Sequence, residues 1–170
     1  MDRDSGYPVS REDINAQAAR LMTDYGDSIL RLAYSYLHNM SDAEDILQES
    51  LIQFLKTQPE LTDPVKEKAW MLRVAGNLSK NRIKYNKLRL TDELQESLAS
   101  DQRDDLSYVW EAVKQLPDKY REVVHLFYYE GYATKEIADI LGRNESTVRS
   151  DLKRGRERLR QILEEGGDQL

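Results

Sequence analysis

The sequence predicts an all-α protein made of two small helical domains joined by an acidic linker. Apolar residues recur at helical spacing in most segments, and the strict alternation typical of strands does not occur. Only four of the 170 residues are proline, so long stretches carry no helix breaker. Charged residues make up 33% of the chain, which suits slender helical modules with much exposed surface.

The first domain is expected over residues 10–90 and begins with a helical pattern that ends near Leu37. Gly26 lies within this pattern and predicts either a break or a tight contact. The apolar positions of the pattern are Ile14, Ala18, Leu21, Met22, Ile29, Leu32, Ala33, Tyr36 and Leu37.

Two further helices complete the first domain. A helix is expected over Ser41–Lys56, because Ser41 is followed by Asp42 and Glu44, and acids in a first turn suit the helix dipole. A loop is expected from Pro59 to Pro64. A long helix from about Val65 to Leu88 should follow it.

Residues 91–105 are expected to form a polar linker, with one possible helical turn at Leu94–Leu98. The second domain is expected over residues 106–165 and contains four helices. These helices run from Leu106 to Leu116, from Tyr120 to Phe127, from a Thr134 cap to Leu141, and from Ser146 to Leu163. Gly131 and Gly142 separate the last three of them, as helix-terminating glycines do.

Charge is distributed unevenly along the chain, whose net charge is −6. Lys66–Arg89 carries eight basic residues and one acid, and Arg143–Arg160 carries seven basic residues and three acids. Thr91–Leu106 between them has six acids and one base. This pattern indicates two separate surfaces that face phosphates. Ordinary solvated helix faces remain the alternative for each basic run.

Other features exclude whole classes of protein. The chain has no cysteine, which excludes disulfides and thiolate metal sites and favours a cytoplasmic location. No apolar run approaches the roughly 18 residues that span a bilayer, and residues 1–10 carry no signal-peptide core. His38 and His125 lie in different modules, without an HExxH motif or a Gly-rich phosphate loop. We therefore expect no enzyme activity, metal or cofactor.

The end of the chain has the spacing of a helix-turn-helix: a short helix, a Gly-containing turn and a longer basic helix. A helix seated in the major groove needs small or polar side chains and Arg or Lys to meet bases and phosphates. A generic basic amphipathic helix is the alternative. The candidate DNA-binding residues are Asn144, Glu145, Ser146, Thr147, Arg149, Ser150, Lys153, Arg154 and Arg156.

Three segments resemble one known family. The last is LPDKYREVVHLFYYEGYATKEIADILGRNESTVRSDLKRGRERLRQIL (116–163), which is similar to region 4 of extracytoplasmic-function (ECF) sigma factors of bacterial RNA polymerase. Upstream, YGDSILRLAYSYLHNMSDAEDILQESLIQFLK (25–56) and KAWMLRVAGNLSKNRIKYNK (68–87) resemble parts of their region 2. The three matches follow the family order and cover nearly all of residues 25–163.

The resemblance implies a subunit that binds core RNA polymerase and directs it to promoter DNA. It implies that the 41–56 helix docks on the β′ clamp coiled coil, that the second domain meets the β flap, and that an anti-sigma factor exists. The residues on the polar side of the 41–56 helix are Glu44, Asp45, Gln48 and Glu49. They are either docking groups or, for the three acids among them, merely residues that suit the helix dipole.

The resemblance also assigns the long basic helix to melting and reading the −10 element, and the last helix to the −35 element. Trp70 stands at a family tryptophan position but on the apolar stripe, so we expect it in the core. Asp151 occupies a position where the family generally carries a basic residue. Its carboxylate should accept a hydrogen bond from a cytosine amino group or cap an arginine. The linker is expected to enter a polymerase channel, or to be an ordinary tether. The candidate −10 residues are Asn77, Lys80, Asn81, Arg82, Lys84 and Lys87.

Two other binding functions compete with this interpretation. A helix-turn-helix repressor that works without polymerase usually dimerises on symmetric operators, and the chain offers no heptad seam beyond its own core. A sigma-like adaptor without promoter activity is the other alternative, against which the retained basic 65–88 helix argues.

Overall fold

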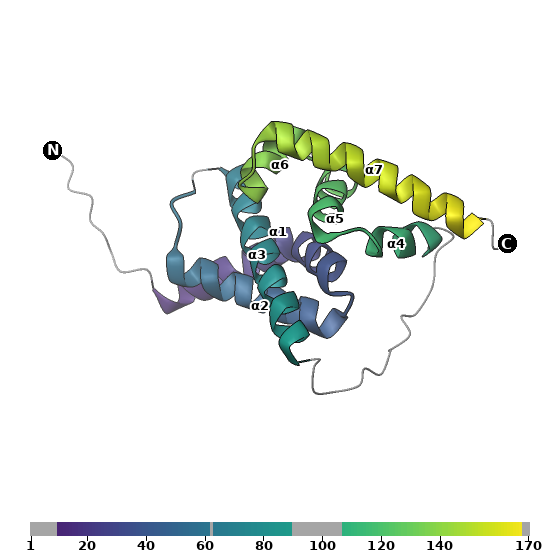
Figure 1. Ribbon diagram of the computed structural model, residues 1–170. Coiled ribbons are helices and arrows are strands. Elements are labelled where there is room, and N and C mark those ends of the chain that lie inside the picture. Colours follow the sequence, from purple (N-terminus) through teal and green to yellow (C-terminus); the bar gives the residue numbers. More distant parts are fainter. Residues whose placement is uncertain (1–9, 62, 90–106, 168–170) are drawn as a thin grey trace.

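The computed structural model describes residues 10–61, 63–89 and 107–167 (Figure 1). Every regular element in these ranges is a helix, which confirms the all-α prediction. The predicted linker 91–105, with its turn at 94–98, lies outside the described residues. The elements are α1 (Arg11–Leu37), α2 (Met40–Thr57), α3 (Pro64–Arg89), α4 (Ser107–Lys114), α5 (Asp118–Val124), the π-helical turn η1 (His125–Tyr129), α6 (Thr134–Leu141) and α7 (Glu145–Gly167).

Helix α1 is longer and more regular than its sequence suggested. It begins with a capping box, in which Ser10 Oγ accepts the Asp13 backbone N–H at 3.1 Å and the Asp13 carboxylate accepts the Ser10 N–H at 3.2 Å. The helix continues through Gly26, so the predicted break is wrong. A glycine costs about 1 kcal/mol inside a helix, which the buried side chains on either side outweigh. Met22, one of the apolar positions of the helical pattern, is 54% exposed.

Asn39 caps helix α2, and the predicted start at Ser41 is wrong by one residue. Asn39 Oδ1 accepts the backbone N–H of Asp42 at 3.0 Å, and asparagine is as good a cap as serine. Because the cap lies earlier, the helix begins at Met40. Its buried side chains pack against α1 and α3 and are Ala43, Ile46, Leu47, Ser50 and Phe54.

Helix α3 completes a three-helix unit with α1 and α2. Asp63 caps it, because its carboxylate accepts the backbone N–H of Val65 at 2.7 Å. Met71, Leu72 and Ala75 are fully buried in the core of this unit. Trp70 is half-buried, and its ring packs edge-on against Phe54 at 5.4 Å between ring centroids, as a core position requires.

The second unit consists of α4 to α7. Gly142 ends α6 in the left-handed conformation with φ 64°, as expected. The predicted Thr134 cap is wrong, because Ala133 occupies the cap position and its backbone N–H donates to Glu136 at 2.8 Å. The buried apolar residues of this unit are Ala112, Val113, Leu116, Val123, Val124, Leu126, Ile137, Ala138, Ile140, Val148 and Leu152.

The helix expected from Tyr120 to Phe127 ends instead in the π-helical turn η1. The backbone N–H of Glu130 donates to the carbonyl of His125 at 3.2 Å, a bond between residues five apart. In this turn His125 is buried, whereas Tyr128 is 57% exposed.

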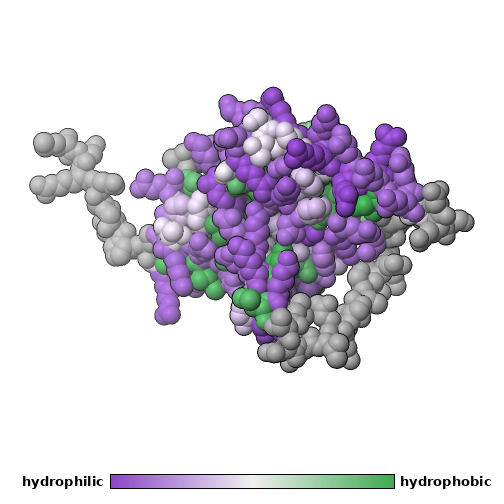
Figure 2. Space-filling view, in the orientation of Figure 1, coloured by the Kyte–Doolittle hydropathy of each residue, from purple (hydrophilic) through white to green (hydrophobic). Residues whose placement is uncertain are grey.

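The two units pack directly against each other, α5 on α1 and α6 on α3 (Figure 1). The face shown in Figure 2 is largely hydrophilic, with small and separate hydrophobic areas. Few charged side chains of the described residues are buried, and two of them, Arg121 and Glu122, lie on α5 where it packs against α1.

Candidate nucleic-acid interface

Helices α6 and α7 form the predicted helix-turn-helix. The turn is closed by the backbone N–H of Arg143, which donates to the carbonyl of Ala138 at 3.0 Å. Val148 and Leu152 are buried at 0% and 4% exposure and anchor the first half of α7 to the core of the second unit. The opposite face of α7 is therefore held rigidly toward solvent.

The candidate residues of α7 nearly all lie on that solvent face. Glu145 is half-buried, because its carboxylate accepts hydrogen bonds from Thr134 Oγ1 at 2.9 Å and Arg149 Nη2 at 2.7 Å. These hydrogen bonds, that from Thr134 above all, lower the pKa of Glu145. Arg156 reaches the Tyr128 hydroxyl at 3.3 Å. The exposed candidates are Asn144, Ser146, Thr147, Arg149, Ser150, Lys153, Arg154 and Arg156.

Asp151 caps an arginine and does not face a groove. Its side chain is 9% exposed, and its Oδ2 lies 3.4 Å from Nη1 of Arg143 in the turn. Of the two roles expected for Asp151, the structure therefore shows the contact with an arginine. Its charge stabilises the turn that precedes α7.

The basic helix α3 divides its candidate residues into two groups. Asn77, Asn81, Lys84 and Lys87 are exposed. Lys80 instead forms an ion pair with Glu122 of α5 at 2.9 Å, and burial lowers the pKa of Lys80. Arg82 is also held in ion pairs, but with residues of its own unit, on α2.

The acidic face of α2 holds Arg82. Arg82 Nη2 donates to Glu49 at 2.9 Å, and its Nη1 lies 3.2 Å from Asp42 and 3.5 Å from Asp45. Burial alone would lower the pKa of Arg82, but the charges of Glu49 and Asp42 raise it above its ordinary value. The candidate polymerase-binding residues Glu44, Asp45, Gln48 and Glu49 are all exposed.

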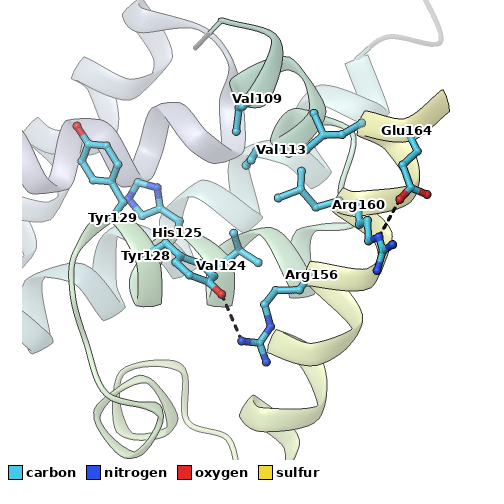
Figure 3. Close-up of a pocket in the computed structure, with 11 residues that line it drawn as sticks. Val109, Val113, Val124, His125, Tyr128, Tyr129, Arg156, Arg160 and Glu164 are labelled. Atoms are coloured by element: carbon cyan, nitrogen blue, oxygen red, sulfur yellow. Dashed lines mark hydrogen bonds and ion pairs between the residues drawn. The ribbon is translucent and has the colours of Figure 1, made fainter. Parts of the chain in front are cut away.

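A groove of about 650 Å³ runs along the second unit between α4, α5, η1 and α7 (Figure 3). Its wall is mainly apolar, with Arg156 and Arg160 along one edge. The apolar residues that line it are Val109, Val113, Val124, Leu159 and Leu163, with Tyr128 and Tyr129.

The described residues form neither a cluster of metal-ligating side chains nor a membrane-spanning helix. Within residues 10–61, 63–89 and 107–167, no three His, Asp or Glu side chains are grouped to hold a metal ion. None of the helices in these ranges combines the length and apolarity needed to cross a bilayer. The charged surfaces of α2, α3 and α7 remain as the candidate sites.

Comparison with known proteins identifies the family. The family described as Sigma-70 region 2 matches residues 21–89, and that described as Sigma-70, region 4 matches residues 106–159. The RNA polymerase sigma factor SigV of Bacillus subtilis (strain 168) is 30% identical over 148 residues, covering 85% of this chain and 89% of that protein. The chain belongs to the sigma-70 family of RNA polymerase sigma factors.

Other relatives place this sigma factor in the ECF group. The ECF RNA polymerase sigma factor SigW of the same organism is 29% identical over 166 residues, covering 85% of this chain and 88% of that protein. The ECF RNA polymerase sigma factor SigE of Mycolicibacterium smegmatis is 32% identical over 158 residues, covering 84% of this chain and 60% of that protein. The resemblance found in the sequence is therefore confirmed.

Two solved structures share the fold of this sigma factor. The sigma factor RpoE from Bartonella quintana, in complex with the anti-sigma factor NepR, has a TM-score of 0.71 at 22% identity, covering 90% of this chain and 98% of that chain. CnrH, in complex with the cytosolic domain of CnrY, has a TM-score of 0.65 at 21% identity, covering 89% and 95%. At this identity the likeness establishes the fold alone.

The residues that join region 2 to region 4 in this sigma factor were not predicted from the sequence. Glu122 is 1% exposed, yet it stands in the sequence as an ordinary acid beside two valines. Arg121 next to it is also buried. Residues 121–124 are all buried, and four consecutive buried residues cannot lie on one face of a helix. Apolar periodicity could not reveal the second buried face, because Arg121 and Glu122 are charged.

Proposed function

We propose that this sigma factor works in the cytoplasm and brings core RNA polymerase to promoters through three of its helices. Residues 10–90 act as region 2 and residues 106–165 as region 4. Helix α7 reads the −35 element, α3 opens and holds the −10 element, and α2 docks on the β′ clamp coiled coil. The family is one of transcription subunits without catalysis, and we extend this to the chain, with no enzymatic role.

The exposed polar row on the first half of α7 is the observation that carries the proposal. A major groove about 12 Å wide admits one helix, and bases are read by short polar side chains and by Arg. Ser146, Thr147 and Ser150 are short enough to allow close approach, whereas Arg149 and Lys153 extend from neighbouring turns. Buried Val148 and Leu152 keep this row in place.

The exposed groups of α3 support a role with single-stranded DNA. Lys84 and Lys87 lie one turn apart and offer charge to a backbone, while Asn77 and Asn81 offer amides to a base edge. Because single-stranded DNA exists only after opening, these residues act after the −35 contact is made. This order follows from the nature of the DNA that α3 binds, since the single strand forms only when the duplex opens.

Polymerase binding is assigned to two further surfaces. The exposed acids of α2 complement a basic coiled coil. The apolar groove beside η1 has the size and lining to take an apolar segment of the β flap. An anti-sigma factor is a further proposed partner, supported by the solved neighbour RpoE, whose structure is a complex with the anti-sigma factor NepR.

Run-off transcription with purified core polymerase on genomic fragments, followed by mapping of the start sites, tests the proposal. We expect transcripts only when core and this protein are both present, with a shared motif upstream of the mapped starts. Specific, nanomolar duplex binding by the protein alone, with no effect on core, would instead identify a polymerase-independent regulator.

A further inference from the structure

One oxygen of Glu145 joins the two helices of the helix-turn-helix. Thr134 Oγ1, in the first turn of α6, donates to Oε1 of Glu145 at 2.9 Å. Arg149 Nη2, one turn further along α7, donates to the same oxygen at 2.7 Å. These three side chains, called the Glu145 relay below, therefore connect α6 with the guanidinium of Arg149.

The carboxylate of Glu145 is held in place from two sides. Glu145 is the first residue of α7, where the backbone N–H groups and the helix dipole favour a negative charge. The hydrogen bond from Thr134 on the other helix fixes the direction of the carboxylate. Its lowered pKa means that Glu145 is ionised at neutral pH. Glu145 thus offers Arg149 a charged acceptor with little freedom to turn away.

Arg149 remains able to bind DNA while it contacts Glu145. Its side chain is 67% exposed, against 37% for Glu145. The contact uses one N–H of Nη2, and a guanidinium carries five N–H donors. A parallel pair of such donors is what O6 and N7 of guanine require. The Glu145 relay therefore restricts the side chain of Arg149 without consuming the donors that a base contact needs.

Restriction of Arg149 in the free protein favours binding. An arginine loses conformational freedom when it is fixed on a base, and an arginine that a neighbour already holds has less freedom left to lose. Glu followed by Arg four residues later is also the favourable order on a helix. The other such pair of α7, Arg160 with Glu164, has the reverse order, and its side chains are 81% and 63% exposed. The pair at Glu145 thus differs in order, in exposure and in its anchor on α6.

We propose that Glu145 is a positioning residue that, held by Thr134, presents Arg149 to one guanine of the −35 element. This rests on the proposed role of α7 at that element. Glu145 acts through Arg149 and does not itself read a base. Thr134 of α6 determines sequence preference in the same way, although it lies on the other helix. Preference for that guanine is therefore a property of three side chains on two helices.

Binding of the holoenzyme to a promoter library with each base at every −35 position tests the relay. Removal of an acid beside DNA strengthens binding to all sequences alike, so the measurement is the affinity ratio between the best base and the other three. Arg149→Ala should remove a guanine preference of roughly five- to a hundredfold at one position. Glu145→Gln, which keeps the shape and removes the charge, should lower the ratio at that same position about threefold or more.

A double-mutant cycle separates positioning from direct reading by Glu145. In the Arg149→Ala protein, Glu145→Gln should change no preference, because no guanidinium is left to position. A loss at a different base position, or the same loss in the Arg149→Ala protein, would show that Glu145 reads a base itself and overturns the relay. Glu165→Gln is the matched control, since it removes an exposed acid from the end of α7 and gives the same net charge. It should leave every preference unchanged.

Thr134 supplies a second arm with a conservative rescue. Thr134→Val keeps the shape of the side chain and removes its hydroxyl, so it should lower the guanine ratio at the Arg149 position by less than Glu145→Gln does. Thr134→Ser keeps the hydroxyl and should restore the ratio. A merely structural role of Thr134 would instead lower binding to all sequences together with the melting temperature. An unchanged ratio in Thr134→Val overturns the anchoring of Glu145 by α6.

The same data distinguish failure of the relay from failure of the proposed function. If Arg149→Ala loses preference at one position and Glu145→Gln loses none, the relay alone is wrong. If Arg149→Ala weakens binding uniformly, the base contact in the proposed function is wrong, and the relay falls with it. Far-UV circular dichroism and thermal unfolding establish that each variant folds.

Discussion

Arg82 of α3 and Glu49 of α2 are joined by a hydrogen bond of 2.9 Å. Arg82 also pairs with Asp42 and Asp45 of α2. One proposed −10 cation and two proposed polymerase-binding acids therefore belong to a single ion-pair cluster between two helices. Charge reversal at Asp45 or Glu49 would disturb the packing of α2 on α3 together with any docking surface, so other positions test docking better.

Glu44 and Gln48 supply that test, because they are exposed on α2 one turn apart and outside the Arg82 cluster. The double variant Glu44→Lys, Gln48→Lys should bind core polymerase about tenfold or more weakly, since it places two cations opposite a basic coiled coil. Its melting temperature should stay near that of the parent. Asp27→Lys on α1 is the control, and equal core binding by the two variants would contradict docking through α2.

Arg149→Ala should cost about 1–3 kcal/mol at one base position of the −35 element and relax preference there. Binding of the holoenzyme to a library of −35 variants measures this. Arg160→Ala is the matched control, because each arginine pairs with a glutamate one turn away on α7, Arg149 with Glu145 and Arg160 with Glu164. A uniform loss over all sequences would make Arg149 a phosphate contact.

Lys84→Ala with Lys87→Ala should lower open-complex formation while protection of the −35 element persists. Both lysines are exposed on α3, and neither takes part in the ion pairs of Lys80 or Arg82. Permanganate reactivity near the −10 element reports the opened strand. A pre-melted template should restore much of the activity, and Lys56→Ala on α2 should behave as the parent. Equal loss of −35 protection would indicate a general electrostatic anchor.

The pKa of His38 in the folded protein should lie far below that of a free histidine. Partial burial, with the charges of Arg121 and Lys114, lowers the pKa of His38 from 6.5 to about 4. The unfolded chain takes up this proton first as the pH falls, so the stabilising contribution is complete above pH 6.5 and is lost between about 6.5 and 4. NMR titration of the imidazole measures the midpoint, and His38→Gln should remove this part of the pH dependence. A midpoint near 6.5 would contradict the contact with Arg121.

Gly155→Ala should destabilise the second unit by about 1–3 kcal/mol, because overpacking a tight contact forces neighbours apart. A Cβ at Gly155 would lie 2.9 Å from Val124 Cγ2 and 3.3 Å from Tyr120 Cβ. Gly26→Ala is the contrasting variant, with only Met22 Cγ at 3.7 Å, and should stabilise α1 by about 0.5–1 kcal/mol. Thermal unfolding of both proteins measures the difference. Stabilisation by Gly155→Ala would show that α5 and α7 are less tightly packed.

Local patterns were enough to predict the helices and the helix-turn-helix. Gly142 could be predicted as a helix end because a left-handed residue there needs no partner elsewhere in the chain. Gly26 led to a wrong prediction of a helix break, because a glycine inside a helix is tolerated when residues around it are buried. That burial depends on the other helices. The two glycines differ in tertiary context and not in local chemistry.

The assignment of charged residues to surfaces was less predictable. Lys80, Arg82 and Lys84 look alike in the sequence, yet the first pairs with α5, the second with α2, and the third is exposed. Helix periodicity gives the direction in which each side chain leaves α3, but the partner in that direction belongs to a segment distant in the chain. Asp151 shows the same limit, since its partner Arg143 is reached only through the turn.

The π-helical turn at residues 125–129 acts as a phase shift between two stretches of chain. A turn of five residues carries one more than an α-helical turn, so all that follows is rotated by about 100° relative to a regular helix. That rotation sets the side from which Glu130 leaves the backbone, toward Arg31 and Lys68. Deleting one residue from this turn would keep a good helix and every charged group, yet aim the carboxylate away from region 2. The alignment between the two regions is thus set by a count of residues as much as by their identity.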